Sequence, residues 1–185
     1  MATIYLQNAP FINKRFIVTT PFSSSHHALD LAPYGYAGSL YAIDNFTIIY
    51  SYTYHEGGST YGNYFIASNG NNTMYLYAHL RDAPPAVGTV YPMGSYICEA
   101  GTTGHSTGVH LHLEMQSGTT WRYNQPASDY INPCTYLTGI INVASSSNVY
   151  ICEGGPTPPT PVIANPNNKF KWVLYSSKLR NKRTN

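Results

Sequence analysis

Short runs of strand-forming residues, separated by turn residues, fill the first 115 positions of this 185-residue chain. No helical periodicity long enough for a crossover connection competes with them there. The pattern therefore predicts an all-β domain, built as an antiparallel sheet with hairpin connections. The expected strands are Phe16–Thr19, Ser39–Ile43, Thr47–Tyr52, Asn63–Ala67, Met74–His79, Ser95–Glu99 and Val109–Met115.

Charge divides the chain into unequal parts. Residues 1–155 carry four basic and eight acidic side chains, a net charge of −4, whereas residues 156–185 carry six basic side chains and no acid. A Pro-rich stretch at 154–161 lies at the junction, and its prolines favour an extended linker. We expect a folded domain at 1–153, a Pro- and Asn-rich linker at 154–168, and a basic, aromatic tail at 169–185.

Three cysteines, at Cys98, Cys134 and Cys152, form no C-x-x-C pair, so they predict neither a disulfide framework nor a thiolate zinc site. A bridge between Cys134 and Cys152 stays open. The segment Met1–Gln7 lacks the basic and apolar regions of a secretory signal, and no stretch approaches the roughly 20 apolar residues of a membrane span. We expect a protein that acts inside the cell, leaves by another route, or is given in its mature form.

Histidines alternate with leucines in the run from Val109 to Glu114. Because successive strand residues point to opposite faces, His110, His112 and Glu114 share one face, and the leucines between them face the core. Two imidazoles on one strand face can address a single small site.

Near the N-terminus, His26 and Asp30 have the spacing H-x-x-x-D within a turn-like, Ser-rich run. With one histidine of the H-L-H pair they would give two imidazoles and one carboxylate, which leave a fourth position on zinc for water, as in catalytic sites. Each motif alone is more common as a polar pair than as a metal site. Loops at Tyr54–Tyr64 and Asn69–Asn72 are expected to rim the groove that holds the site.

In their order and spacing, H-x-x-x-D, Tyr77–Leu80 (Y-A-H-L) and H-L-H resemble the lysostaphin-like zinc endopeptidases of bacterial cell walls. Gly101–Glu114 is similar to that family's most specific signature, and Ile131–Leu137 to its closing segment. The resemblance covers roughly residues 13–139. It implies that His26, Asp30 and His112 bind zinc and that His79 and His110 are the catalytic imidazoles.

Three positions depart from the family pattern without removing a ligand: Ala28 replaces Gly, Val109 replaces Pro, and Leu113 replaces Phe. A shifted register with His27 as ligand is an alternative, although the spacing from His26 to Asp30 fits the motif better.

No H-E-x-x-H motif is present, so Glu114 is expected to orient an imidazole rather than to act as the base. Which of His79 and His110 is the base stays open. We assign no role to His55 or to His105, which is interpreted as an exposed loop residue.

The resemblance implies hydrolysis of peptide bonds in peptidoglycan, in a stem peptide or cross-bridge, at the bacterial cell wall. Without a secretory signal, the expected setting is a phage lysin or a wall-opening enzyme of a phage particle. One alternative is a structural or binding module with weak or no catalysis. Another is a cupin-like metalloenzyme, in which the acid normally follows the H-x-H motif at a longer spacing than Glu114 does.

The tail at 169–185 mixes six basic residues with aromatic and apolar ones, which predicts docking to an anionic wall polymer, lipid or nucleic acid. The alternative is a solvated tail or one that packs on the acidic domain. Deleting residues 156–185 should preserve hydrolysis of small soluble peptides and weaken binding to whole walls, while full-length binding falls as salt rises. Unfolding of the truncated protein, or wall binding indifferent to deletion and salt, would contradict docking.

Overall fold

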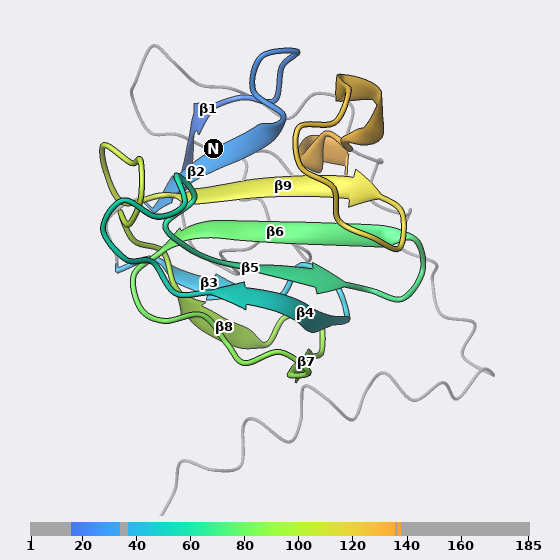
Figure 1. The fold of residues 1–185 in the computed structure, drawn as a ribbon, viewed down its shortest axis with the longest axis horizontal. Coiled ribbons are helices and arrows are strands. Elements are labelled where there is room, and N and C mark those ends of the chain that lie inside the picture. Colours follow the sequence, from blue (N-terminus) through green and yellow to red (C-terminus); the bar gives the residue numbers. More distant parts are fainter. Residues whose placement is uncertain (1–15, 34–36, 136, 138–185) are drawn as a thin grey trace, which may run out of the picture.

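The computed structural model describes residues 16–33, 37–135 and 137 (Figure 1). Seven strands form one antiparallel sheet in the order β1-β2-β9-β6-β5-β4-β7, and β3 and β8 form a second sheet. The expected all-β fold is confirmed. The strands are β1 Phe16–Thr20, β2 Ala28–Pro33, β3 Ser39–Tyr41, β4 Phe46–Tyr52, β5 Asn63–Ser68, β6 Thr73–Leu80, β7 Val90–Tyr91, β8 Tyr96–Glu99 and β9 Leu111–Ser117; two short 3-10 helices, η1 Ala127–Asp129 and η2 Pro133–Thr135, follow them.

The sequence pattern missed two strands of the main sheet, β2 and the two-residue strand β7. Residues 28–30 were expected to continue a turn, but they begin a strand that pairs with β1 on one side and β9 on the other. This strand lacks the β-branched and aromatic residues that mark strands in a sequence, because Ala28–Leu31 is buried and needs small and aliphatic side chains. Boundaries also differ: the last strand runs from Leu111 to Ser117 rather than from Val109 to Met115, and β3 ends at Tyr41 rather than Ile43.

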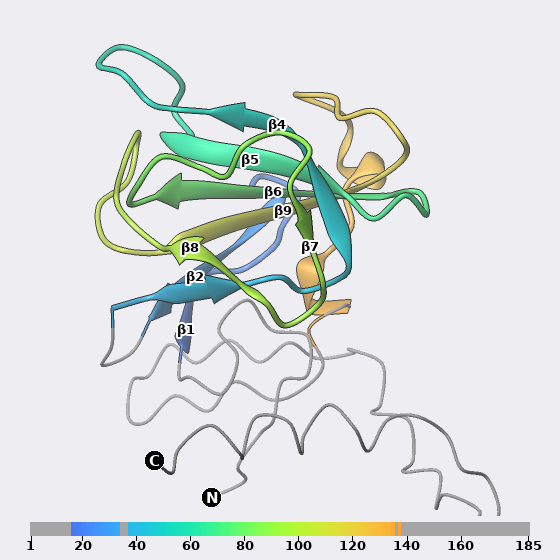
Figure 2. The same ribbon diagram turned by 90° about the horizontal axis from the view of Figure 1, so that it is seen from below.

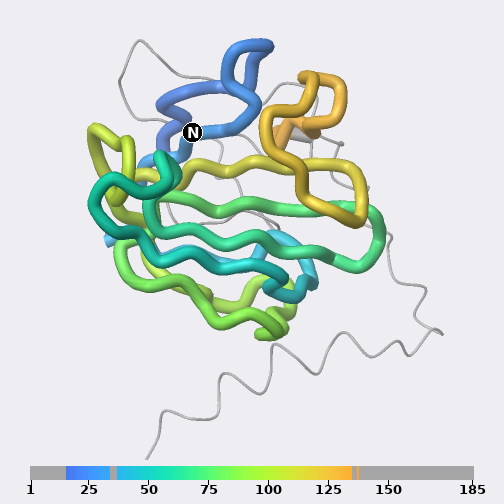
Figure 3. The backbone as a smooth tube through the Cα atoms, viewed as in Figure 1, coloured from blue at the N-terminus to red at the C-terminus, as the bar shows by residue number. Residues whose placement is uncertain are grey.

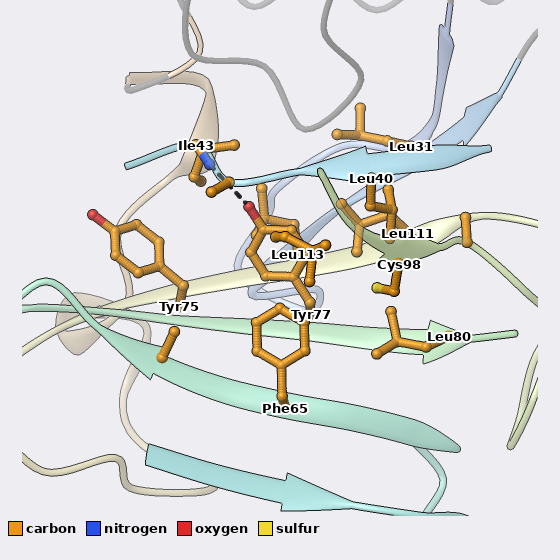
Figure 4. Close-up of a cluster of buried hydrophobic side chains, with 14 of the residues drawn as sticks. Leu31, Leu40, Ile43, Phe65, Tyr75, Tyr77, Leu80, Cys98, Leu111 and Leu113 are labelled. Carbon is orange, nitrogen blue, oxygen red and sulfur yellow. Dashed lines mark hydrogen bonds between the residues drawn. The ribbon is translucent and has the colours of Figure 1, made fainter. Parts of the chain in front are cut away.

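The main hydrophobic core takes side chains from both sheets. The strands of the two sheets are seen from below in Figure 2. Leu40 of β3 and Cys98 of β8 point toward Leu80 and Leu111 of the large sheet (Figure 4). The small sheet therefore covers one face of the large sheet and leaves the other face available for a site.

A smaller apolar cluster occupies that other face. Tyr64, Ile66, Met74, Leu76 and Ala78 form it, and it lies on β5 and β6. All eight residues of β6 are buried, so this strand is covered on both faces. The polar groups next to the cluster therefore pack against buried apolar side chains.

The loop between β4 and β5 lies beside the loop between β8 and β9 at one end of the large sheet (Figure 3). The His105 N–H donates to the Thr60 carbonyl at 2.8 Å. Gly62 has φ +67°, and a Cβ there would come within 2.3 Å of the Thr103 backbone, so only glycine permits this approach. The contact fixes the two loops relative to each other.

Other sequence predictions fall partly or wholly outside the described residues. The linker at 154–168 and the tail at 169–185 lie outside them, as does Cys152. Cys98 is a free, buried thiol, and Cys134 is disulfide-bonded. In the part of the chain that the structure describes, no helix has the length and apolar character needed to cross a bilayer.

Replacing Phe65 with alanine tests the core. Phe65 is fully buried and stacks on Tyr77 with ring centroids 4.8 Å apart. Phe65→Ala should lower the free energy of unfolding by about 3–5 kcal/mol, measured by urea denaturation, because it leaves a cavity. The control Val87→Ala, at a residue that is 61% exposed, should change it by less than about 0.5 kcal/mol. Equal effects of the two substitutions would contradict this packing.

Candidate active site

A cavity of about 320 Å³ opens beside the two packed loops. All five residues that the sequence singled out as ligands or catalytic groups line it. The lining consists of His26, Asp30, Thr60, Tyr61, His79, His105, Ser106, Thr107, His110 and His112.

Asp30 and His112 meet because their strands pair. Asp30 of β2 lies directly opposite His112 of β9, and directly opposite residues of an antiparallel pair point to the same face. Asp30 Oδ1 lies 2.8 Å from His112 Nδ1. On the other side His112 lies opposite Ala78 of β6, whose small side chain leaves room for the imidazole.

His26 reaches the same point from the loop before β2. Ser23 closes that loop, because its hydroxyl accepts a hydrogen bond from the His26 N–H at 3.1 Å. His26 Nδ1 lies 3.3 Å from the Pro21 carbonyl, and Nε2 lies 3.3 Å from Asp30 Oδ2. The ligand atoms of His26, Asp30 and His112 all lie within 4.8 Å of one another, so the three residues can hold a metal ion.

His79 is brought to the cavity by an unusual backbone conformation. Alternation would place its side chain on the core face, opposite to Ala78, but His79 has φ +57°. Its backbone N–H donates to the Tyr61 carbonyl, and its carbonyl accepts from the Gly101 N–H. These bonds hold the left-handed conformation that turns the imidazole into the site.

His110 completes a second pair of imidazoles. Its ring centroid lies 4.7 Å from that of His79, and its Nε2 lies 3.9 Å from Asp30 Oδ1. The Nδ1 atoms of His79 and His110 each face a backbone carbonyl, Thr103 and Gly108 respectively, at 2.8 Å. Because a carbonyl only accepts hydrogen bonds, each Nδ1 carries the proton when the ring is neutral, and each Nε2 is left with a lone pair.

Burial and hydrogen bonding shift the pKa values of the site's ionisable side chains in different directions. Burial alone would raise the pKa of Asp30, but hydrogen bonds from His112 and His26 outweigh it and hold the pKa well below its usual range. Burial lowers the pKa of His79 to about 4, and the bond to Thr103 offsets this only in part. Asp30 is therefore ionised and His79 neutral at pH 7.

His112 is held between two carboxylates. Burial would lower its pKa, yet hydrogen bonds to Asp30 and Glu114 raise it to about 9. Its Nε2 lies 3.0 Å from Glu114 Oε1 and its Nδ1 faces Asp30. A metal ion held by Asp30 would take the place of the proton on Nδ1, and Glu114 would keep the proton on Nε2.

Two histidines occupy positions that bear on the sequence predictions. The His27 ring lies tilted against Tyr130 with ring centroids 4.6 Å apart, its Nε2 lies 3.0 Å from the Ser24 carbonyl, and His27 is not among the residues that line the cavity. His105 is exposed, as expected, but it lines the cavity, which its loop position in the sequence did not indicate. The loop at Asn69–Asn72 was expected to rim the groove but joins β5 to β6 at the end of β6 remote from His79.

Two further residues of the site lie in segments that the sequence analysis singled out, but no role of their own was predicted for them. Tyr61 lines the cavity and bonds Glu114, and the Thr103 carbonyl holds His79. No local pattern marks them, because their partners lie 53 and 24 positions away in the sequence.

An antiparallel sheet that carries a His-Asp-His group beside two further imidazoles has the architecture of a metallopeptidase. The chain belongs to peptidase family M23, which it matches over residues 24–129. The resemblance that the sequence motifs indicated is thereby confirmed.

Solved structures of similar fold include a zinc-containing peptidase from Vibrio cholerae, with a TM-score of 0.51 and 23% identity over 60% of this chain and 36% of that one. The catalytic domain of the antimicrobial peptidase lysostaphin from Staphylococcus simulans gives 0.51 and 21%, over 67% of this chain and 92% of that one. A mutant catalytic domain of the prophage-encoded M23 protein EnpA from Enterococcus faecalis gives 0.54 and 20%, over 70% and 97%. At these identities the likeness is one of fold. The chain spans about a third of the length of the Vibrio structure.

Metal binding tests the His-Asp-His group directly. With Zn²⁺ as the probe, the protein should retain one ion per chain after dialysis, and His112→Ala should lose it, because only two ligand side chains remain. The matched control is His55→Ala, since His55 is an exposed histidine that contacts Tyr52 outside the cavity. Undiminished metal in His112→Ala by elemental analysis would contradict the ligand set.

Proposed function

We propose that the protein is a zinc-dependent endopeptidase that hydrolyses peptide bonds in bacterial peptidoglycan, in a stem peptide or a cross-bridge. The observation that carries the proposal is the meeting of two groups in one cavity of an M23 fold. One group is His26, Asp30 and His112, and the other is His79 and His110.

The donor set fits zinc. Two imidazoles and one carboxylate are preferred zinc ligands, and three protein ligands leave a position open for catalysis. The hydrogen bonds from His26 Nδ1 to Pro21 and from His112 Nε2 to Glu114 leave one nitrogen of each ring for the metal. When bound, zinc supplies Lewis acidity that activates water toward an amide carbonyl.

His79 and His110 supply the proton chemistry in this proposal. Each presents an unprotonated Nε2, held by a hydrogen bond at Nδ1, and can accept a proton from the attacking water there. The low pKa of His79 keeps it neutral at pH 7. The imidazole that accepts this proton becomes a donor: it steadies the charge that develops on the carbonyl oxygen and returns the proton to the leaving amine.

The proposed setting is the bacterial cell wall, in phage-associated lysis or penetration. Membership of the M23 family supports a wall peptide as substrate, and the open cavity suits an extended chain. Retention of all five site residues favours catalysis over the alternative of a structural or binding module. Docking of the 169–185 tail to an anionic polymer, lipid or nucleic acid remains part of the proposal.

Replacing the catalytic pair should separate chemistry from metal binding. His79→Ala and His110→Ala should each lower the rate of peptidoglycan hydrolysis by about 10²–10⁴-fold, because a positioned acid or base is lost. Each variant should retain zinc in the elemental analysis that shows its loss from His112→Ala. Loss of zinc from either variant, with zinc kept in His112→Ala, would reverse the assignment of ligands and catalytic residues.

The identity of the cleaved bond tests the reaction class. Digestion of purified peptidoglycan should release new peptide amines and no new reducing sugar, as read by mass spectrometry and end-group assays. New reducing ends without free amines would make the protein a glycosidase. Absence of both products with zinc bound would favour the binding module.

A further inference from the structure

Tyr61 reaches the candidate metal site through a buried carboxylate. Its hydroxyl donates to Glu114 Oε1 at 2.6 Å, and the same oxygen lies 3.0 Å from His112 Nε2. Glu114 is 5% exposed, and its other carboxylate oxygen is buried with no hydrogen-bond partner among the residues that the structure describes. Two donors, Tyr61 and His112, therefore converge on one oxygen and fix the orientation of Glu114.

The position of Tyr61 is itself fixed from several sides. Its backbone N–H donates to Ser59 Oγ at 3.2 Å, and its carbonyl accepts from the His79 N–H at 2.9 Å. The next residue, Gly62, packs closely against Thr103. The backbone of Tyr61 is thus hydrogen-bonded to His79, one of the proposed catalytic histidines. Its side chain contacts Glu114, which in turn contacts His112, a proposed zinc ligand.

We propose that Tyr61 is a positioning residue for the metal site: by holding Glu114, it keeps the His112 proton on Nε2 and turns Nδ1 toward the metal. A phenol hydroxyl that forms a hydrogen bond to a carboxylate can only donate, so the Tyr61 hydroxyl holds Oε1 of Glu114 in place. A carboxylate fixed at Nε2 makes His112 a better oriented ligand. The inference rests on the proposed zinc site.

A purely structural reading makes different predictions. The ring of Tyr61 also packs near Tyr64 and Tyr123, with centroids 5.4 and 6.4 Å away, so it could act as filler in the aromatic cluster. Tyr61→Phe keeps the ring and removes only the hydroxyl. A filler role would leave metal binding unchanged, whereas the positioning role requires the hydroxyl.

The experiment compares the zinc affinity of full-length variants by competition with a chromophoric chelator. Tyr61→Phe should weaken zinc binding by about tenfold, the effect of losing one hydrogen bond to a buried charge. Tyr64→Phe is the matched control, because its hydroxyl bonds Tyr123 at 3.0 Å in the same cluster, and it should bind zinc as the parent protein does. Glu114→Gln should weaken binding by about 10–100-fold.

The double variant Tyr61→Phe/Glu114→Gln tests whether Tyr61 acts through Glu114. It should bind zinc no more weakly than Glu114→Gln alone, because the two changes break one chain of interactions. In zinc-loaded protein, the nitrogen resonances of His112 should report the proton on Nε2, and Tyr61→Phe should speed its exchange with water while Tyr64→Phe should not.

Unchanged zinc affinity in Tyr61→Phe, equal losses in Tyr61→Phe and Tyr64→Phe, or additive losses in the double variant would overturn the proposal. Should Tyr61→Phe fail to fold, unchanged affinity in Glu114→Gln would overturn it. These readouts are independent of cleavage: a protein that binds zinc with this dependence on Tyr61 but does not cut peptidoglycan would refute the proposed function and leave the positioning role standing.

Discussion

The pairing of β2 with β9 is the interaction on which the whole site depends. It sets Asp30 opposite His112 and brings a carboxylate oxygen within 2.8 Å of an imidazole nitrogen. A slip of one residue would turn one of these side chains into the core. Fully buried leucines on the other face oppose that slip, because those of the slipped strand would have to face the polar side. They are Leu29 and Leu31 on β2, and Leu111 and Leu113 on β9.

The strand order turns this pair into a larger constellation. Because β9 lies between β2 and β6, segments far apart in the sequence deliver side chains to one cavity. The His79 side chain reaches the cavity only because its left-handed backbone conformation interrupts the alternation of side-chain direction along β6. Thr103 links these parts: its carbonyl holds the His79 ring, and its hydroxyl accepts the Asn63 N–H and donates to the Leu80 carbonyl. The loop between β8 and β9 is therefore hydrogen-bonded to the start of β5 and the end of β6.

Local patterns in the sequence were sufficient to predict the fold class and the alternating face of β9. Leu111 and Leu113 are fully buried, and His112 lies on the opposite face beside Glu114, as period-two geometry requires. The joint presence of His26, Asp30 and His112 could be predicted only from the resemblance to a family. The adjacency of β2 and β9 in the sheet depends on pairing between segments that are distant in the sequence, and no local pattern encodes such pairing.

Tyr61 shows the same limit at the level of a single residue. In the sequence it is one of 18 tyrosines, within a loop of small and polar residues. Its significance arises from a hydrogen bond to a residue 53 positions away. The conformation of His79 was equally hidden, because a positive φ in a histidine has no signature in composition or spacing.

The most direct test of this account is a crystal structure of the protein grown with Zn²⁺ and measured at the zinc absorption edge. One anomalous peak is expected in the cavity, within bonding distance of His26 Nε2, an Asp30 carboxylate oxygen and His112 Nδ1. His79 and His110 should lie near the peak without bonding it. A peak ligated by His79 and His110 instead, or a peak bonded to His112 through Nε2, would contradict the assignment of the site.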